Sequence, residues 1–174
     1  FETAAKAFAL TDRADLVGKA ISILANKAGI YGMIGGQSVD VEYTDRPVTK
    51  SQLEFIYELK TAALLEAAMM IGAVLAGADD NQVKSAEQIA HHVGMAFQIR
   101  DDILDVISTT EELGKPVKSD EKNNKTTYVT IYGLDGASKL VEEYSHTAMT
   151  LLDQVCPNAS FLKRLFEYLI VRKK

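Results

Sequence analysis

An apolar helix that carries three aspartates on one face is the feature that most restricts how this chain can fold. It lies in the segment FQIRDDILD, residues 97–105. At 3.6 residues per turn, four polar side chains fall at positions i, i+3, i+4 and i+7 and form one narrow stripe: Gln98, Asp101, Asp102 and Asp105. Asp is unfavourable in helix interiors, and like charges on one face repel each other. Something has to offset that strain, and a bound multivalent cation is the obvious candidate.

Carboxylate oxygens of this kind suit Mg²⁺. This hard cation keeps much of its water and commonly bridges protein carboxylates to substrate phosphates. Asp101 and Asp105, one helical turn apart, are predicted to share such ions. The alternative is an acidic, solvated helix face. The stripe lacks the interleaved Lys and Glu of an ordinary wet surface, but the aspartates alone do not decide between the two interpretations.

Three lysines accompany this helix in the sequence and favour a diphosphate ligand. Lys60 begins an apolar helix and is followed by Thr61, while Lys115 and Lys125 lie in the polar segment 109–125. The charge of a diphosphate requires both metal and ammonium partners. Each lysine alone is typical of a protein surface, so it is their arrangement that supports the hypothesis. The segment 109–125 is predicted to be a loop, and long loops beside charged sites often act as lids.

The rest of the pattern is helical and predicts a single all-α domain over residues 1–174. With 174 residues, 47% of them hydrophobic, the chain is long enough to bury a core. No stretch shows the alternation of a β-strand. Helices are predicted near residues 1–10, 13–43, 50–77, 81–107, 126–153 and 159–172.

Several residues signal where these helices begin, end or bend. Pro47 separates the second and third predicted helices, and Gly77 ends the third. Gly35 and Gly36, inside a helical pattern, predict a kink or a close contact between helices. The predicted N-terminal caps are a capping box of Ser51 with Glu54, and Asp79 with Asp80 for the next helix.

Residues 61–78, TAALLEAAMMIGAVLAGA, are the one stretch that could pass for a membrane span. It carries Glu66 and is at the short end of the roughly 17–25 residues that a span needs. A helix that is apolar all round is also what a large bundle places at its centre, and polar helices flank this one. We therefore predict a buried helix and no membrane span.

Composition narrows the class of protein further. The net charge of −5 argues against general nucleic-acid binding, for which a basic face is expected. Cys156 is the single cysteine, which excludes an internal disulfide framework and fits a reducing compartment such as the cytoplasm. No N-terminal signal peptide is visible. The chain opens on Phe1 in the middle of a helical pattern, which suggests that earlier residues are missing.

A few polar and sulfur-containing residues are interpreted as structural. His91 and His92 are adjacent, point in different directions on a helix and match no zinc spacing. Met69, Met70 and Met95 are predicted to fill the core.

Five segments in register along the chain resemble the trans-isoprenyl diphosphate synthases of the short-chain, farnesyl or geranylgeranyl type. They are GGQSVD at 35–40, KT at 60–61, FQIRDDILD at 97–105, GKPVKSD at 114–120 and NNKTTY at 123–128. Any one of them is modest evidence, but five in the same order are highly specific. The chain is similar to the C-terminal part of such a synthase, and DDILD corresponds to the family's second aspartate-rich motif.

The resemblance implies an all-α, isoprenoid-synthase-type bundle around a central cavity, usually homodimeric. It implies Mg²⁺-dependent condensation of an allylic diphosphate with isopentenyl diphosphate, giving farnesyl or geranylgeranyl diphosphate in isoprenoid biosynthesis. By the family pattern Asp101 and Asp105 would bind metal, with Asp102 beside them and Asp120 supporting the cluster through water. Catalysis would rest on these residues: Asp101, Asp102, Asp105, Lys60 and Thr61.

The same pattern implies which residues bind the substrates. The allylic diphosphate would be held by Lys60, Lys115 and Lys125. Phe97 and Gln98 would face the substrates, and Gln37 of the GGQSVD segment is assigned to substrate binding as well. Thr61 would place the isopentenyl partner or stabilise the carbocation.

The chemistry of the reaction agrees with this assignment. Diphosphate leaves carbon readily only when its developing charge is neutralised, which metal ions and lysines can do. Water would destroy the resulting allylic carbocation, so the reaction needs a dry, apolar cavity. The alanine-rich helix that begins at Lys60 is predicted to supply one wall of that cavity.

One part of the family pattern is missing. The family carries a first aspartate-rich motif, followed by paired arginines, on an earlier helix, and nothing in this sequence matches it. The family's basic residues for isopentenyl diphosphate also lie upstream. We therefore predict that the native protein is longer, and that this polypeptide alone does not catalyse the reaction.

Two other classes of protein remain as alternatives. A class I terpene cyclase would share the helical fold, but its second metal motif is built on Asn, Ser and Glu, and NNKTTYV does not supply one. A non-catalytic helical subunit of a heteromeric prenyl synthase has little reason to retain all three aspartates together with Lys60, Lys115 and Lys125.

Overall fold

The computed structural model describes residues 2–108 and 125–172, and within these ranges all regular structure is helical. The all-α prediction is confirmed. The first helices are α1 (Glu2–Lys6), the 3₁₀ helix η1 (Ala7–Ala9), α2 (Ala14–Ala28), α3 (Met33–Glu42) and α4 (Lys50–Tyr57). They are followed by the π-helical turn η2 (Glu58–Ala62), α5 (Ala63–Leu75), α6 (Asp80–Ile107), α9 (Tyr128–Val155) and α10 (Ser160–Val171).

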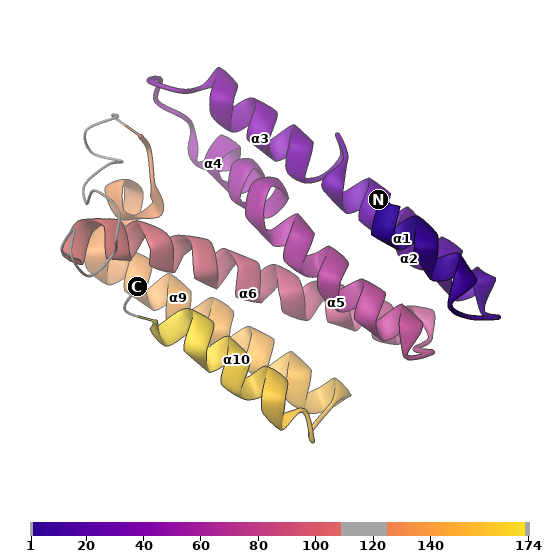
Figure 1. The fold of residues 1–174 in the computed structure, drawn as a ribbon. Coiled ribbons are helices and arrows are strands. Elements are labelled where there is room, and N and C mark those ends of the chain that lie inside the picture. Colours follow the sequence, from indigo (N-terminus) through magenta and orange to yellow (C-terminus); the bar gives the residue numbers. More distant parts are fainter. Residues whose placement is uncertain (1, 109–124, 173–174) are drawn as a thin grey trace.

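In Figure 1, α2 and α3 lie roughly in line along one side, and α4, η2 and α5 follow one another as a second row beside them. On one side α2 packs against α5, and α3 packs against α4 and η2. The long helix α6 packs against α5 on one face and against α9 on another, and α10 closes the opposite side of the bundle. The helix of the aspartate stripe is therefore the central element of the described fold.

The prediction of one helix over residues 13–43 is wrong, because the chain turns between α2 and α3 at residues 29–32. The backbone N–H of Gly29 donates to the carbonyl of Asn26, which closes α2. Gly32 then turns so close to the preceding helix that a Cβ there would lie 1.9 Å from the carbonyl oxygen of Lys27. The helical periodicity continues across the turn, which is why the sequence pattern did not reveal it.

The helix caps agree with the predictions at one site and differ at another. Thr49, not Ser51, caps α4: its side chain accepts from the backbone N–H of Gln52, and the Gln52 side chain accepts from the Thr49 N–H at 2.8 Å. The predicted cap at Asp79 is confirmed, as a capping box with Gln82. Gly77 ends α5 with a φ of 84°, as predicted, because glycine tolerates this left-handed conformation.

Two clusters of buried apolar residues hold the helices together. The larger lies between α4, α6 and α9 and includes Leu53, Met95, Ile99, Tyr128 and Val141. The smaller joins α6, α9 and α10 through these side chains: Ile89, Val93, Ala148, Leu152 and Phe166. Each cluster buries the apolar face of α6 against a partner helix, and such burial is the main driving force of folding.

The apolar helix α5 packs between α2 and α6 with one face buried, as predicted, but its other face is open, and Leu64 and Leu75 are exposed. None of the described helices is long and apolar enough to cross a membrane. The one acidic residue of α5, Glu66, is buried and accepts from the Lys27 ammonium on α2 and from the His91 ring on α6. Burial alone would raise the pKa of Glu66, but the hydrogen bonds from His91 and Lys27 hold it below its ordinary value. The hydrogen bond to Glu66 also raises the pKa of His91. This charged cluster ties α2, α5 and α6 together.

The helix α6 passes very close to the end of η2 at Gly94. A Cβ at this position would lie 2.6 Å from the Cβ of Ala62 and 2.7 Å from its Cα. Real Cβ atoms do not approach each other so closely, so a side chain at residue 94 would push the two helices apart.

We expect Gly94→Ala to lower the free energy of unfolding by about 1–3 kcal/mol, because it overpacks a helix contact made by backbone atoms. Gly18→Ala is the matched control, since no atom lies within 4 Å of the Cβ it would add in α2. The control should raise stability by about 0.5–1 kcal/mol through helix propensity. Urea denaturation measures the free energy of unfolding of wild type and of both variants. Equal values for Gly94→Ala and Gly18→Ala would contradict the close contact at Gly94.

Candidate active site

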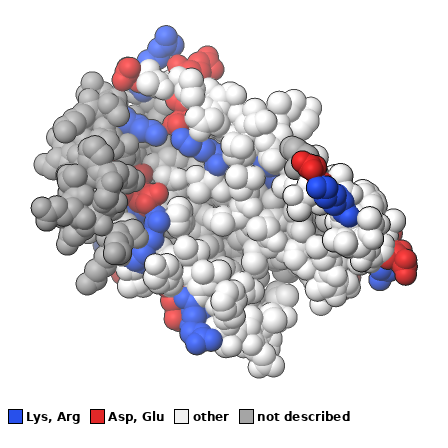
Figure 2. Space-filling model, viewed as in Figure 1, with Lys and Arg blue, Asp and Glu red and all other residues white. Residues whose placement is uncertain are grey.

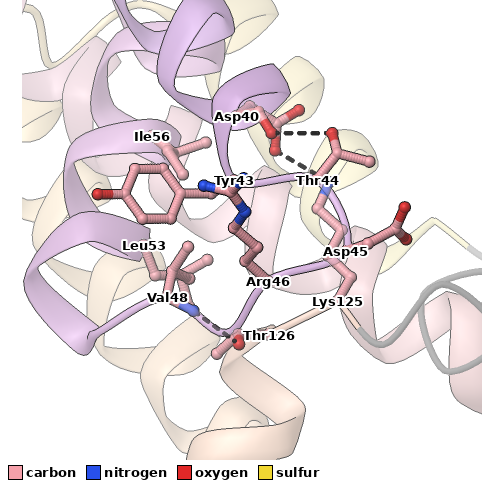
Figure 3. A pocket seen from close by; sticks show the side chains of 10 residues that line it. All are labelled: Asp40, Tyr43, Thr44, Asp45, Arg46, Val48, Leu53, Ile56, Lys125 and Thr126. Atoms are coloured by element: carbon pink, nitrogen blue, oxygen red, sulfur yellow. Dashed lines mark hydrogen bonds and ion pairs between the residues drawn. The ribbon is translucent and has the colours of Figure 1, made fainter.

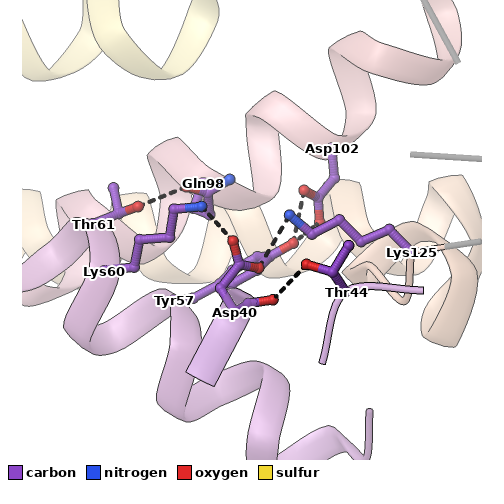
Figure 4. Close-up of polar contacts among 8 residues, drawn as sticks. All are labelled: Asp40, Thr44, Tyr57, Lys60, Thr61, Gln98, Asp102 and Lys125. Carbon is purple, nitrogen blue, oxygen red and sulfur yellow. Dashed lines mark hydrogen bonds and ion pairs between the residues drawn. The ribbon is translucent and has the colours of Figure 1, made fainter. Parts of the chain in front are cut away.

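Some of the predicted site residues come together where α3, η2, the second half of α6 and the start of α9 meet (Figure 4). They are Lys60, Thr61, Gln98, Asp102 and Lys125. Two lysines from distant parts of the sequence point there at one carboxylate. The ammonium of Lys60 lies 2.6 Å from Asp40 Oδ2, and that of Lys125 lies 3.2 Å from Asp40 Oδ1. Burial alone would raise the pKa of Asp40, but the hydrogen bond from Lys60 and the charge of Lys125 hold it below its ordinary value.

Lys60 is positioned by the local backbone. It lies in the π-helical turn η2, between two regular helices, and such turns occur frequently at functional sites. Gly36 of α3 packs directly on this turn, because a Cβ there would lie 2.4 Å from the backbone nitrogen of Lys60. The predicted close packing at the glycine pair is confirmed, and it brings Asp40, four residues further along α3, to the lysine.

Thr61 and Gln98 form a second contact beside this ion pair. The Thr61 hydroxyl donates to the Gln98 amide oxygen at 2.7 Å and so joins η2 to α6 (Figure 4). Both residues were predicted to face the substrates. Gln37, the third predicted polar residue here, lies on α3 and lines a separate shallow hollow with Ile34 and Val41.

The three aspartates of α6 do not share one environment. Asp102 is only 4% exposed and accepts hydrogen bonds from the Tyr57 hydroxyl, at 2.7 and 2.8 Å, and from the backbone N–H of Tyr128 at 3.0 Å. Asp105 is also buried, at 3% exposure. Asp101 is partly exposed and pairs with Arg172 at the end of α10 at 2.5 Å. The guanidinium of Arg172 lies over the Phe97 ring, 3.7 Å from its centroid.

Two residues form ion pairs with predicted site residues but were not themselves predicted as site residues: Asp40 and Arg172. Asp40 belongs to the GGQSVD segment, so its position in that segment was a signal that it could matter. Arg172 follows the last helix, more than sixty residues beyond Asp101 in sequence, and no motif marks it. The predicted site residues Lys115 and Asp120 and the predicted loop up to residue 124 lie outside the described residues.

The carboxylates fit Mg²⁺ as one part of a larger ligand set. Asp101 and Asp105 lie one turn apart on α6, and both offer the oxygen donors that this ion prefers. In residues 2–108 and 125–172, no three Asp, Glu, His or Cys side chains are arranged to hold a metal ion on their own. Mg²⁺ is commonly held by one or two carboxylates plus phosphate oxygens and waters, so the donor chemistry fits an ion bridged to a diphosphate.

A cavity of about 350 Å³ adjoins Asp40 and Lys125 (Figure 3). Its floor is apolar, whereas acidic and basic side chains line its rim. The lining residues are Asp40, Tyr43, Thr44, Asp45, Arg46, Val48, Leu53, Ile56, Lys125 and Thr126. On the face of the molecule seen in Figure 2, charged side chains gather toward the edges, and the middle carries almost none.

The family model described as polyprenyl synthetase matches residues 3–159. The chain belongs to this family. It is 38% identical over 152 residues to the farnesyl diphosphate synthase of Geobacillus stearothermophilus, which covers 87% of this chain and 51% of that protein. It is 42% identical over 130 residues to the geranylgeranyl diphosphate synthase of Cyanophora paradoxa, which covers 74% of this chain and 43% of that protein. The chain spans about half the length of the curated relatives it matches.

Solved structures of this polyprenyl synthetase family share the fold. The geranyltransferase of Helicobacter pylori, complexed with magnesium and isoprenyl diphosphate, has a TM-score of 0.76 at 31% identity and covers 91% of this chain and 52% of that one. The geranyltransferase of Legionella pneumophila has a TM-score of 0.77 at 26% identity and covers 99% of this chain and 55% of that one. The resemblance to the short-chain synthases and the predicted isoprenoid-synthase-type fold are confirmed.

The buried contact between Tyr57 and Asp102 yields a test of how this polyprenyl synthetase chain holds its site together. We expect Tyr57→Phe to lower the free energy of unfolding by about 1–2 kcal/mol, because it removes a hydrogen bond to a buried carboxylate. Tyr168→Phe removes a hydroxyl from a side chain that is 69% exposed and should change stability by less than about 0.5 kcal/mol. Chemical denaturation compares them, and a Tyr57 variant as stable as its control would show that the bond contributes nothing.

Proposed function

We propose that this chain forms the diphosphate-binding part of a prenyltransferase that condenses an allylic diphosphate with isopentenyl diphosphate. The product would be farnesyl or geranylgeranyl diphosphate, and the cofactor Mg²⁺. The observation that carries the proposal is the meeting of Lys60 and Lys125 at Asp40, beside the helix of Asp101 and Asp105. Cations and metal-binding carboxylates at one place suit a ligand with several negative charges.

The lysines have the role of neutralising the leaving diphosphate. Asp40 holds the ammonium groups of Lys60 and Lys125 on one side of the site. A diphosphate that binds there can take over hydrogen bonds from both lysines, because their positive charges are already gathered. We assign Lys115 to the same role from the family pattern.

The aspartates have different roles in this proposal. Asp101 and Asp105 would hold Mg²⁺, which when bound supplies the positive charge that stabilises the departing diphosphate. Asp102 lies in the same motif, and its hydrogen bonds to Tyr57 and to the Tyr128 N–H would keep α6 aligned with α4 and α9. Asp120 is proposed to support the metal cluster through water.

The remaining residues would handle the apolar part of the substrates and the carbocation. Thr61, held by Gln98, is proposed to place isopentenyl diphosphate or to stabilise the cation with its hydroxyl oxygen. Phe97 and Gln98 would face the substrates from α6, whereas Gln37 is assigned to substrate binding from the family pattern alone. The apolar helix α5 continues directly from η2 and would exclude water from the prenyl chain, since water would quench the cation.

The test measures binding of inorganic diphosphate to the full-length protein by isothermal titration calorimetry, with and without Mg²⁺. We expect diphosphate binding to require Mg²⁺. Its affinity should fall by about tenfold or more in Asp101→Asn and in Lys60→Gln. The turnover of isopentenyl and allylic diphosphates should fall about 100-fold or more in both variants. Lys139→Gln, at an exposed position in α9, is the matched control and should change neither.

A diphosphate affinity that changes neither when Mg²⁺ is removed nor in Asp101→Asn would overturn the metal assignment. A full-length protein that binds no diphosphate at all would instead favour a non-catalytic subunit of a heteromeric synthase. A protein that binds diphosphate but releases a cyclised hydrocarbon would favour a terpene cyclase.

We also propose that a second copy of the chain covers the apolar surface at the turn between α2 and α3 and along α3. Four large side chains there are strongly exposed, at 68%, 75%, 49% and 61%: Ile30, Tyr31, Ile34 and Val41. Ile34 and Val41 lie two turns apart on the same face of α3. A contiguous apolar face of this kind is typical of an interface between protein molecules.

We expect sedimentation equilibrium of the full-length protein to give twice the mass of one chain. The double variant Ile34→Glu with Val41→Glu should dissociate the dimer, because it places charges in an apolar interface. Val171→Glu, on the exposed face of α10, is the control and should leave the mass unchanged. A wild-type protein with the mass of a single chain would contradict the dimer.

A further inference from the structure

The end of α10 is held against the aspartate helix at three points, all of them through Arg172. Its side-chain Nη2 lies 2.5 Å from Asp101 Oδ1. Its guanidinium lies over the Phe97 ring, 3.7 Å from the centroid. Its backbone carbonyl accepts from Nη2 and Nε of Arg100, at 3.2 and 3.4 Å. A single arginine therefore contacts three residues of α6: the carboxylate of Asp101, the ring of Phe97 and the guanidinium of Arg100.

These contacts make more than an ordinary surface ion pair. Phe97 and Asp101 are four residues apart on α6, so the ring and the carboxylate lie on the same face, and one guanidinium reaches both. The Arg172 side chain is 15% exposed and that of Asp101 32%. Partial burial strengthens both the ion pair and the stacking of the cation on the ring.

The same contacts leave the arginine incompletely satisfied. Its buried Nε finds no hydrogen-bond acceptor in the described part of the chain. A buried donor without a partner costs free energy, so the guanidinium is held less strongly here than a fully hydrogen-bonded one would be. A ligand that competes for Asp101 can therefore displace it more easily.

We propose that Arg172 is a positioning residue that competes with the divalent cation for Asp101. The inference rests on the proposed function, because it takes Asp101 as a metal-binding carboxylate. A divalent ion on this carboxylate would lie within a few ångströms of the guanidinium, and two cations at that separation repel each other. Binding of the metal therefore has to move Arg172, and with it the end of α10, away from the aspartate helix.

The competition works in both directions. If Arg172 lowers the affinity of Asp101 for the metal by some factor, the metal weakens the hold of Asp101 on Arg172 by the same factor. The protein would bind free metal weakly while Arg172 is in place. Occupation of the metal site would release the end of the last helix.

The experiment measures Mn²⁺ binding to the full-length protein by electron paramagnetic resonance of the free ion, without any substrate. Arg172→Gln should bind Mn²⁺ roughly three- to tenfold more tightly than wild type, because the competing cation is gone. Phe97→Leu leaves the net charge unchanged but removes the ring that holds the guanidinium, and should shift the affinity in the same direction by a smaller factor. Arg164→Gln removes a charge from the same helix and should match wild type, because among the described residues the Arg164 guanidinium donates only to the carbonyl of Ser160.

The reciprocal effect has its own readout. Modification of Arg172 by phenylglyoxal, followed by mass spectrometry, should become faster when Mn²⁺ is added to wild type. It should not respond to Mn²⁺ in Asp101→Asn.

The outcomes separate this inference from the proposed function. If wild type binds Mn²⁺ and Asp101→Asn weakens that binding, but Arg172→Gln matches Arg164→Gln, the competition is overturned and the metal site stands. A gain in Arg172→Gln with none in Phe97→Leu points to a long-range effect of charge and also overturns it. If Asp101→Asn binds Mn²⁺ as wild type does, the metal assignment fails, and this inference fails with it.

Discussion

The buried carboxylate of Asp102 is the contact on which the arrangement of the site depends. It accepts hydrogen bonds from the hydroxyl of Tyr57 at the end of α4 and from the backbone N–H of Tyr128 at the start of α9. The carboxylate on α6 therefore fixes the end of α4 and the start of α9 relative to each other. Lys60 lies three residues after Tyr57, and Lys125 three residues before Tyr128. A single carboxylate in the protein interior therefore sets the position of both lysines. Because unpaired charges are so costly when buried, this contact permits little variation in geometry.

The two lysines would repel each other without a counter-charge, and Asp40 supplies it from α3. Asp40 reaches the lysines because α3 lies very close to η2. Gly36 has no side chain, so the backbone of α3 can contact the backbone of η2 at Lys60. Asp40 thus offsets one of the two positive charges of the lysines, whereas Asp101 and Arg172 neutralise each other one to one. Under the proposed function this site binds a highly charged diphosphate with a metal ion, and exchanging one set of ion pairs for another lowers the cost of gathering that charge.

The apolar part of the molecule has a complementary role. α5 continues from the turn of Lys60 and Thr61 into the bundle, and its only acidic residue is neutralised by Lys27 and His91. One helix therefore begins with polar groups that suit a diphosphate and continues as a surface that suits a prenyl chain. The aspartate helix α6 differs, because apolar side chains are buried along both of its halves, and its three aspartates stand among the core residues of the second half.

The sequence by itself determined the class of fold and the family, and it predicted several of the residues that helix packing brings together. Helical periodicity indicated α-helices because it records which face of each helix is buried, and the aspartate stripe stood out because it lacks the interleaved Lys and Glu of an ordinary solvated face. The turn between α2 and α3 escaped this reasoning, since the periodicity continues through residues 29–32 and only the approach of Gly32 to Lys27 requires the break. Likewise the capping box moved from Ser51 to Thr49, because the start of α4 depends on where the chain emerges from the preceding turn.

Only the tertiary structure decided how the site is organised. The sequence places three aspartates on one stripe, but the packing of α4 and α9 buries Asp102 and leaves Asp101 partly open. It also brings Asp40 to Lys60 and Lys125, and Arg172 to Asp101, across 20, 85 and 71 positions of sequence. Such pairs depend on the relative placement of whole helices, and local periodicity carries no information about that placement. Residue types and spacings therefore indicated which groups take part, and helix packing determined which of them meet.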